Sequence, residues 1–99
     1  MYLNIHQTKM GRIIAVCDQD LIDKVFKEGE KLIDLKSHKS FYVGKKATKE
    51  DVKRELEIGF GSVNFVGSKA TKLLLELEFV SKEDILHIAD VPYTQIYNM

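Results

Sequence analysis

Polar and apolar residues alternate at the start of the chain, and this period of two predicts a β-strand over residues 2–7. Lys9, Met10 and Gly11 are expected to turn the chain into a second strand, because residues 13–16 form a continuous apolar run between turn signals. Residues 32–35 and 40–43 predict short extended segments. Further strands are expected at residues 62–66, 85–89 and 95–97, with a bend at Val91 and Pro92.

Two later segments carry clear helix signals. The stronger begins near Ser68, where a helical stripe at i, i+3, i+4 and i+7 consists of Ala70, Leu73, Leu74 and Leu77. The other begins at Thr48, which stands three residues before Asp51 as in a capping box and predicts a helix that ends near Gly59.

A third helix is expected between Asp18 or Asp20, as the N-cap, and Gly29, as the stop signal. Its apolar face would consist of Leu21, Ile22, Val25 and Phe26. Together the segments predict an α+β fold: a single domain over residues 1–99, with a mixed β-sheet and about three helices packed on it. A length of 99 residues, 44% of them hydrophobic and 30% charged, fits one globular core.

The chain carries few signals of location or metal chemistry. Its single cysteine, Cys17, excludes an intrachain disulfide, and no apolar run approaches the roughly 20 residues that span a bilayer. We therefore expect a cytoplasmic protein without a membrane partner. Three scattered histidines give no ligand pair at metal-binding spacing, so neither a metal nor a cofactor is expected.

Charge is balanced overall but divided along the sequence. The formal net charge is zero, which argues against a domain whose main task is to neutralise nucleic acid. Residues 36–54 hold seven basic side chains against two acidic ones, whereas residues 76–99 hold five acidic side chains against Lys82. This division either orients a partner or reflects two solvated faces.

Two short segments indicate anion or nucleophile chemistry. The strand-to-helix passage through Gly67, Ser68 and Lys69 would direct free backbone N–H groups at an anion, although Ser68 is also a good N-cap. Cys17, followed by Asp18 at an expected helix start, is either an activated thiol or a small buried hydrophobic residue.

An aromatic pair lies beside the basic stretch. Phe41 and Tyr42 could stack on a base while nearby lysines hold phosphates, or they could pack on a strand face. The candidate nucleic-acid-binding residues are Tyr42, Lys45, Lys46, Lys49, Lys53 and Arg54.

Four short motifs occur in a fixed order: Ala15-Val16-Cys17-Asp18, Phe41-Tyr42-x-Gly44, Asn64-x-Val66-Gly67 and Val91-Pro92-x-x-Gln95-Ile96. In this combination the chain resembles a small archaeal family catalogued as domain of unknown function 424. The resemblance covers essentially the whole chain and implies no established activity. It does imply that the genes of this family occur together with translation and ribosome-assembly genes. Its characteristic positions are Cys17, Asp18, Tyr42, Gly44, Asn64, Gly67, Pro92 and Gln95.

The chain departs from the family at Tyr93, where the family often has histidine after Val-Pro, so a mechanism that needs an imidazole there is in doubt. Our hypothesis is a non-catalytic binding module associated with RNA or with a protein of the translation machinery. The expected ligand-binding residues are Asn64, Gly67, Ser68, Lys69, Pro92, Tyr93 and Gln95. The alternatives are a small enzyme or anionic-ligand-binding protein that uses Cys17, Asp18 and the Ser68 helix terminus, and a protein–protein adaptor.

Overall fold

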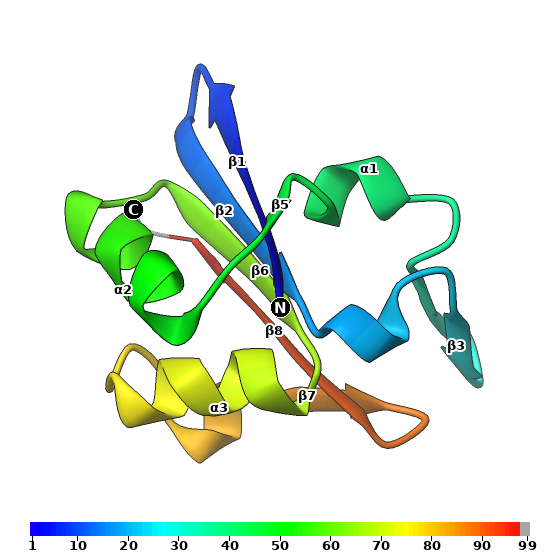
Figure 1. Ribbon diagram of the computed structural model, residues 1–99. Coiled ribbons are helices and arrows are strands. Elements are labelled where there is room, and N and C mark those ends of the chain that lie inside the picture. Colours follow the sequence, from blue (N-terminus) through cyan, green and yellow to red (C-terminus); the bar gives the residue numbers. More distant parts are fainter. Residues whose placement is uncertain (98–99) are drawn as a thin grey trace.

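A six-stranded mixed sheet forms the centre of the computed structural model, which describes residues 1–97 (Figure 1). The strand order is β5 (Lys45–Lys46), β1 (Tyr2–Thr8), β2 (Gly11–Cys17), β6 (Ser62–Val66), β8 (Val91–Tyr97) and β7 (Leu86–Ile88). Only β2 and β6 pair in parallel, and all the other neighbours are antiparallel. The predicted N-terminal hairpin and the strand at residues 62–66 are confirmed.

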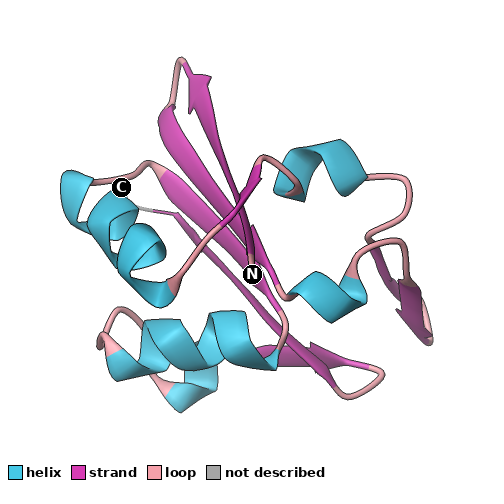
Figure 2. Cartoon of the chain, viewed as in Figure 1, coloured by secondary structure: helices cyan, strands magenta, loops and turns pink. Residues whose placement is uncertain are grey.

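Helices lie on both faces of the sheet (Figure 2). Helices α2 (Lys49–Ile58) and α3 (Ser68–Glu76) cover one face, and the short α1 (Lys39–Tyr42) lies on the other. A separate hairpin of β3 (Val25–Glu28) and β4 (Lys31–Asp34) stands beside α1. Two 3-10 turns complete the described chain, η1 (Gln19–Leu21) and η2 (Lys82–Asp84). The predicted class, one α+β domain with a mixed sheet and three helices, is confirmed.

The main core fills the space between the sheet and helices α2 and α3. Because side chains alternate across a strand, Val63 and Phe65 of β6 point into this core, and Asn64 points to the opposite face. Helix α3 contributes Ala70, Leu73 and Leu74, all buried as predicted, and the partly buried Leu77 packs against the same cluster. Helix α2 begins at the predicted capping box of Thr48 and Asp51.

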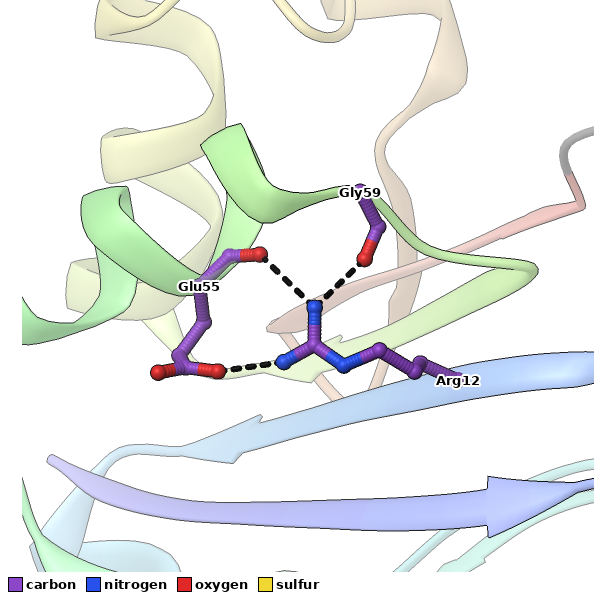
Figure 3. Close-up of polar contacts among 3 residues, drawn as sticks. All are labelled: Arg12, Glu55 and Gly59. Atoms are coloured by element: carbon purple, nitrogen blue, oxygen red, sulfur yellow. Dashed lines mark hydrogen bonds and ion pairs between the residues drawn. The ribbon is translucent and has the colours of Figure 1, made fainter.

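Arg12 ties the sheet to the end of α2 (Figure 3). Its Nη1 donates to the Gly59 carbonyl at 2.6 Å and to the Glu55 carbonyl at 3.3 Å, while its Nη2 pairs with the Glu55 carboxylate. These carbonyls belong to the last turn of the helix, where a cation is favourable and acceptors lack intrahelical partners. Arg12 therefore fixes the angle at which α2 meets the sheet.

The predicted helix between Asp18 and Gly29 is wrong. Only the short η1 forms there, and Asp23 adopts a φ of 71°, which ends any helical path. The chain then enters β3 and turns at Gly29 into β4. Leu21, Ile22 and Phe26 do pack inward, but from different elements, and Val25 is 50% exposed. The helical spacing of these residues was therefore accidental.

Two smaller predictions also need correction. Residues 40–43 are not a strand, since α1 occupies this segment. The bend expected at Val91 and Pro92 lies two residues earlier, at Ala89 and Asp90, which both have positive φ and join β7 to β8 in a tight hairpin.

Candidate functional site

A cleft of about 620 Å³ lies on the sheet face opposite α2 and α3. Strands β6 and β8 supply its floor, and α1 and β4 supply its walls. Much of its surface is apolar or aromatic, with a few polar side chains on the floor and walls. A concave, largely apolar site with few polar groups is the usual form of a ligand site in proteins.

Two side-chain amides stand next to each other on the cleft floor. Asn64 of β6 and Gln95 of β8 are direct partners in the antiparallel register, so their side chains leave the sheet on the same face. Asn64 is half-buried and Gln95 is exposed. Among residues 1–97, neither amide has a hydrogen-bond partner on another side chain or on the backbone. Two adjacent groups that both donate and accept are therefore open to a ligand.

Aromatic rings form one wall. Phe41 and Tyr42 of α1 meet edge to face with ring centroids 5.1 Å apart, and Phe41 stacks on His6 at 4.6 Å. Tyr93 of β8 contributes a further ring. Burial, with a smaller effect of the nearby Cys17, raises the pKa of Tyr42 to about 12, so its hydroxyl keeps its proton at neutral pH. Phe41 and Tyr42 thus form an uncharged surface that is suited to a flat ligand.

Helix α1 is only one turn long, and β1 holds it in place. Asn4 Nδ2 donates to the Ser40 carbonyl at 3.0 Å, and His6 Nε2 donates to the Phe41 carbonyl at 2.8 Å. The chain after α1 also approaches β1 closely, since a Cβ on Gly44 would lie 2.6 Å from the Leu3 carbonyl oxygen. These contacts explain both the helix and the need for glycine at position 44.

Charged groups on the cleft are few. Lys31 and Asp34 stand at the two ends of β4, and His38 lies beyond Asp34. The Ser37 backbone N–H, with a smaller contribution from that of Lys36, lowers the pKa of Asp34. Among the residues that the structure describes, no group of three or more His, Cys, Asp or Glu side chains could hold a metal ion.

The N-terminus of α3 already binds a carboxylate from the chain itself. The Asp18 oxygens accept from the N–H groups of Lys69 at 3.0 Å and Ala70 at 2.9 Å. Gly67 is the N-cap, so Ser68 does not have the expected capping position. A Cβ on Gly67 would overlap the Asp18 carboxylate, which explains the glycine. The amides proposed for an external anion are therefore engaged internally.

Cys17 is fully buried at the end of β2 and packs against Leu35, Val66 and Val91. Burial raises the pKa of its thiol from 9.0 to about 12, with a smaller contribution from the Asp18 charge. The thiol donates to the Asp18 carbonyl at 3.3 Å. Because a nucleophile needs an accessible thiolate, these surroundings oppose the reactivity that the enzyme alternative requires.

The structure gathers only part of the candidate site residues. Asn64, Tyr93, Gln95 and Tyr42 line the cleft. Ser68 and Pro92 line a second, shallower groove of about 320 Å³ beside Lys72 and Lys82, and Lys69 is exposed at the start of α3. Gly67 is a buried structural position. The basic candidates lie elsewhere: Lys45 and Lys46 on the edge strand β5, and Lys49, Lys53 and Arg54 on α2.

Sequence reasoning missed the wall that β4 supplies. Lys31, Ile33 and Asp34 line the cleft, as does His38. The expected strand at residues 32–35 was the only signal in this region, and nothing in it indicated a site.

Fold and cleft together define a small α+β domain with a ligand-sized site on one face of its sheet. The chain belongs to the family described as DUF424, protein of unknown function, whose model matches residues 5–99, as its motifs indicated. The same fold occurs in the crystal structure of an uncharacterized conserved protein from Methanopyrus kandleri, with a TM-score of 0.82 and 22% identity over 97% of this chain and 89% of that chain. No curated protein matches the chain. None of the helices formed by residues 1–97 is long and apolar enough to cross a membrane.

Proposed function

We propose that this protein is an RNA-binding module that holds an unpaired base in the cleft on the open face of its sheet. The observation that carries the proposal is the meeting of aromatic rings with two unpartnered amides, Asn64 and Gln95, in one cleft. Sequence-specific RNA recognition uses this combination, because an unpaired base stacks on aromatic side chains and forms hydrogen bonds through its edge.

The aromatic rings and the amides would contact different parts of the base. Tyr42 and Tyr93 offer ring faces or edges that contact a base without regard to its identity. The amides of Asn64 and Gln95 each present a donor and an acceptor, so they complement the edge of a base. Because Lys31 and Asp34 offset each other's charge, the cleft suits the base better than the phosphate.

Phosphates would be held outside the cleft. Lys45 and Lys46 on the edge strand β5 would supply the positive charge, and such contacts position RNA without reading its sequence. Lys49, Lys53 and Arg54 lie on α2, across the sheet from the cleft. A role in the translation machinery and a cytoplasmic location fit this proposal, since structured RNA with exposed loops is abundant there. The proposal needs no catalytic group.

The test removes the amides and keeps the fold. In fluorescence anisotropy with short labelled oligouridine, oligoadenosine and oligocytidine, Asn64→Ala with Gln95→Ala should weaken binding of at least one oligomer by about thirtyfold, because two hydrogen bonds of roughly 1 kcal/mol each are lost. Gln7→Ala with Gln19→Ala is the matched control, since both amides are exposed and lie outside the cleft. Circular dichroism verifies folding of both double variants.

The basic surface gives an independent readout. Lys45→Gln with Lys46→Gln should weaken all oligomers to a similar degree and reduce the dependence of affinity on salt, because phosphate contacts release counterions. The proposal fails if the wild-type protein binds none of the oligomers at about 50 mM salt. It also fails if the amide double variant binds each of them as the wild type does.

A further inference from the structure

Asp34 is the only acidic residue that lines the cleft within residues 1–97. It ends β4, where it is half-buried, and its Oδ1 accepts from the backbone N–H groups of Ser37 at 2.8 Å and Lys36 at 3.1 Å. His38 also donates, through Nδ1, to the Asp34 carbonyl at 3.1 Å. The carboxylate is thus fixed by the turn that leads into α1. Both backbone donors use the same oxygen.

A fixed carboxylate restricts what the cleft can hold. It repels phosphate and accepts hydrogen bonds from O–H or N–H groups, so the part of the ligand beside it must be a hydrogen-bond donor that carries no negative charge. The hydrogen bonds from Lys36 and Ser37 keep the pKa of Asp34 low, and the acceptor is therefore ionised at neutral pH. Lys31, at the other end of β4, balances the charge of the cleft as a whole.

A nucleoside offers such a donor away from the base edge. If the edge of the base meets Asn64 and Gln95 on the floor, the sugar, which is attached on another side of the base, is directed toward the walls. Asp34 belongs to a wall and not to the floor. Carboxylates accept from ribose hydroxyls in dinucleotide-binding folds, and the 2′-hydroxyl is the group by which proteins distinguish RNA from DNA.

We propose that Asp34 accepts a hydrogen bond from the ribose 2′-hydroxyl of the nucleoside in the cleft and so selects RNA over DNA. This inference rests on the proposed RNA-binding function of the same cleft and adds the sugar as the group that is recognised. It assigns a specificity role to a residue that carries no sequence signal of its own.

Oligouridine and oligodeoxyuridine provide the test, because uracil has no exocyclic amino group and the two probes differ only at the 2′-position. The wild-type protein should bind the ribose form about tenfold more tightly, the equivalent of one hydrogen bond to a charged group. Asp34→Asn retains an oxygen for the Lys36 and Ser37 amides and should reduce this ratio at least about threefold. Glu30→Gln removes one exposed charge from the same hairpin, does not touch the cleft and should leave the ratio unchanged.

Each other outcome has a definite meaning. Equal binding of both probes by the wild type overturns the inference and leaves the proposed function standing. A ratio that survives Asp34→Asn shows that another group reads the sugar, which also overturns the inference. In a second arm, Asp34→Asn could weaken oligoadenosine and oligodeoxyadenosine equally and leave both uracil probes unaffected. That result would assign Asp34 to the amino group of the base and overturn its role in recognising the sugar. Failure of all probes to bind the wild type rejects the proposed function itself.

Discussion

Replacement of Asp18 by alanine should strongly destabilise the fold, although this residue touches no ligand. Its carboxylate accepts from the N–H groups of Lys69 and Ala70, and Ala70 is completely buried. Loss of an N-cap costs about 1 kcal/mol, and a buried N–H left without a partner costs about 1–3 kcal/mol more. Loss of a negative charge at a helix N-terminus adds about 0.3–1 kcal/mol. Since these contributions overlap, we expect the free energy of unfolding to fall by about 3 kcal/mol.

Urea unfolding followed by far-UV circular dichroism measures this change. The slope of the free energy with urea should stay constant while the midpoint falls, because the cap changes stability and not the surface exposed on unfolding. Asp18→Asn retains an acceptor and should lose about half as much. Asp20→Ala, an exposed acid two residues away, should lie within about 0.5 kcal/mol of wild type. A loss below about 1 kcal/mol for Asp18→Ala would refute the assigned cap.

Gly67 provides a check on the same contact. A Cβ at this position would lie 2.5 Å from Asp18 Oδ2 and 2.6 Å from Oδ1, and the backbone φ of 111° is itself unfavourable for alanine. Gly67→Ala should therefore be severe in the wild type and milder, although still destabilising, when Asp18 is alanine. The double-mutant cycle should give a coupling energy of about 1 kcal/mol or more. Simple additivity would show that the two residues do not share one site.

Three further predictions concern the core, the contacts of Arg12 with the end of α2, and alkaline pH. Leu74→Ala should lower the free energy of unfolding by about 2–5 kcal/mol in urea titration, because Leu74 is fully buried, and a loss below about 1 kcal/mol would contradict its place in the core. Arg12→Met should lower the free energy of unfolding by about 1.5–3 kcal/mol in the same assay, while replacement of the exposed Arg54 by methionine should change it little. Equal effects would contradict the role of Arg12 in holding the end of α2. Burial raises the pKa of the Cys17 thiol from 9.0 to about 12, so the folded protein holds this proton more tightly than the unfolded chain does. The stability that the buried thiol contributes is therefore complete below pH 9.0 and is lost as the pH rises to about 12. In this window wild type should lose about 1.4 kcal/mol per pH unit more than Cys17→Ala, and parallel stability curves would contradict the raised pKa.

The elements that could be predicted are those whose local signals agree with their tertiary surroundings. Helix α3 has a leucine stripe that faces the core, and α2 has a capping box formed by its own first turn. The failed helix at residues 18–29 had a good N-cap in Asp18, but this carboxylate caps α3, which lies about fifty residues later. A cap is a short-range signal only when its partner is local, and sequence spacing does not reveal the partner.

Short elements depend still more on distant contacts. Residues 39–42 form a helix because Asn4 and His6 form hydrogen bonds to two of its carbonyls. No property of Phe41 or Tyr42 indicates these contacts. The cleft was accessible to sequence reasoning only in part. Asn64 became a candidate through the Asn64-x-Val66-Gly67 motif. Gln95 became its neighbour through strand register, and Asp34 joined the site through a hairpin of which only the second strand was predicted.

Hydrogen bonds distinguish two parts of the expected ligand-binding set, the start of α3 and the cleft. At the start of α3, the amides of Lys69 and Ala70 already bind a carboxylate, so an external anion must first displace Asp18 and leave that charge buried. The exchange of one anion for another gains little. In the cleft, Asn64 and Gln95 have no partner among residues 1–97, and a ligand there forms hydrogen bonds that replace only those to water. These hydrogen bonds therefore support the proposed site on the sheet face rather than one at the helix terminus.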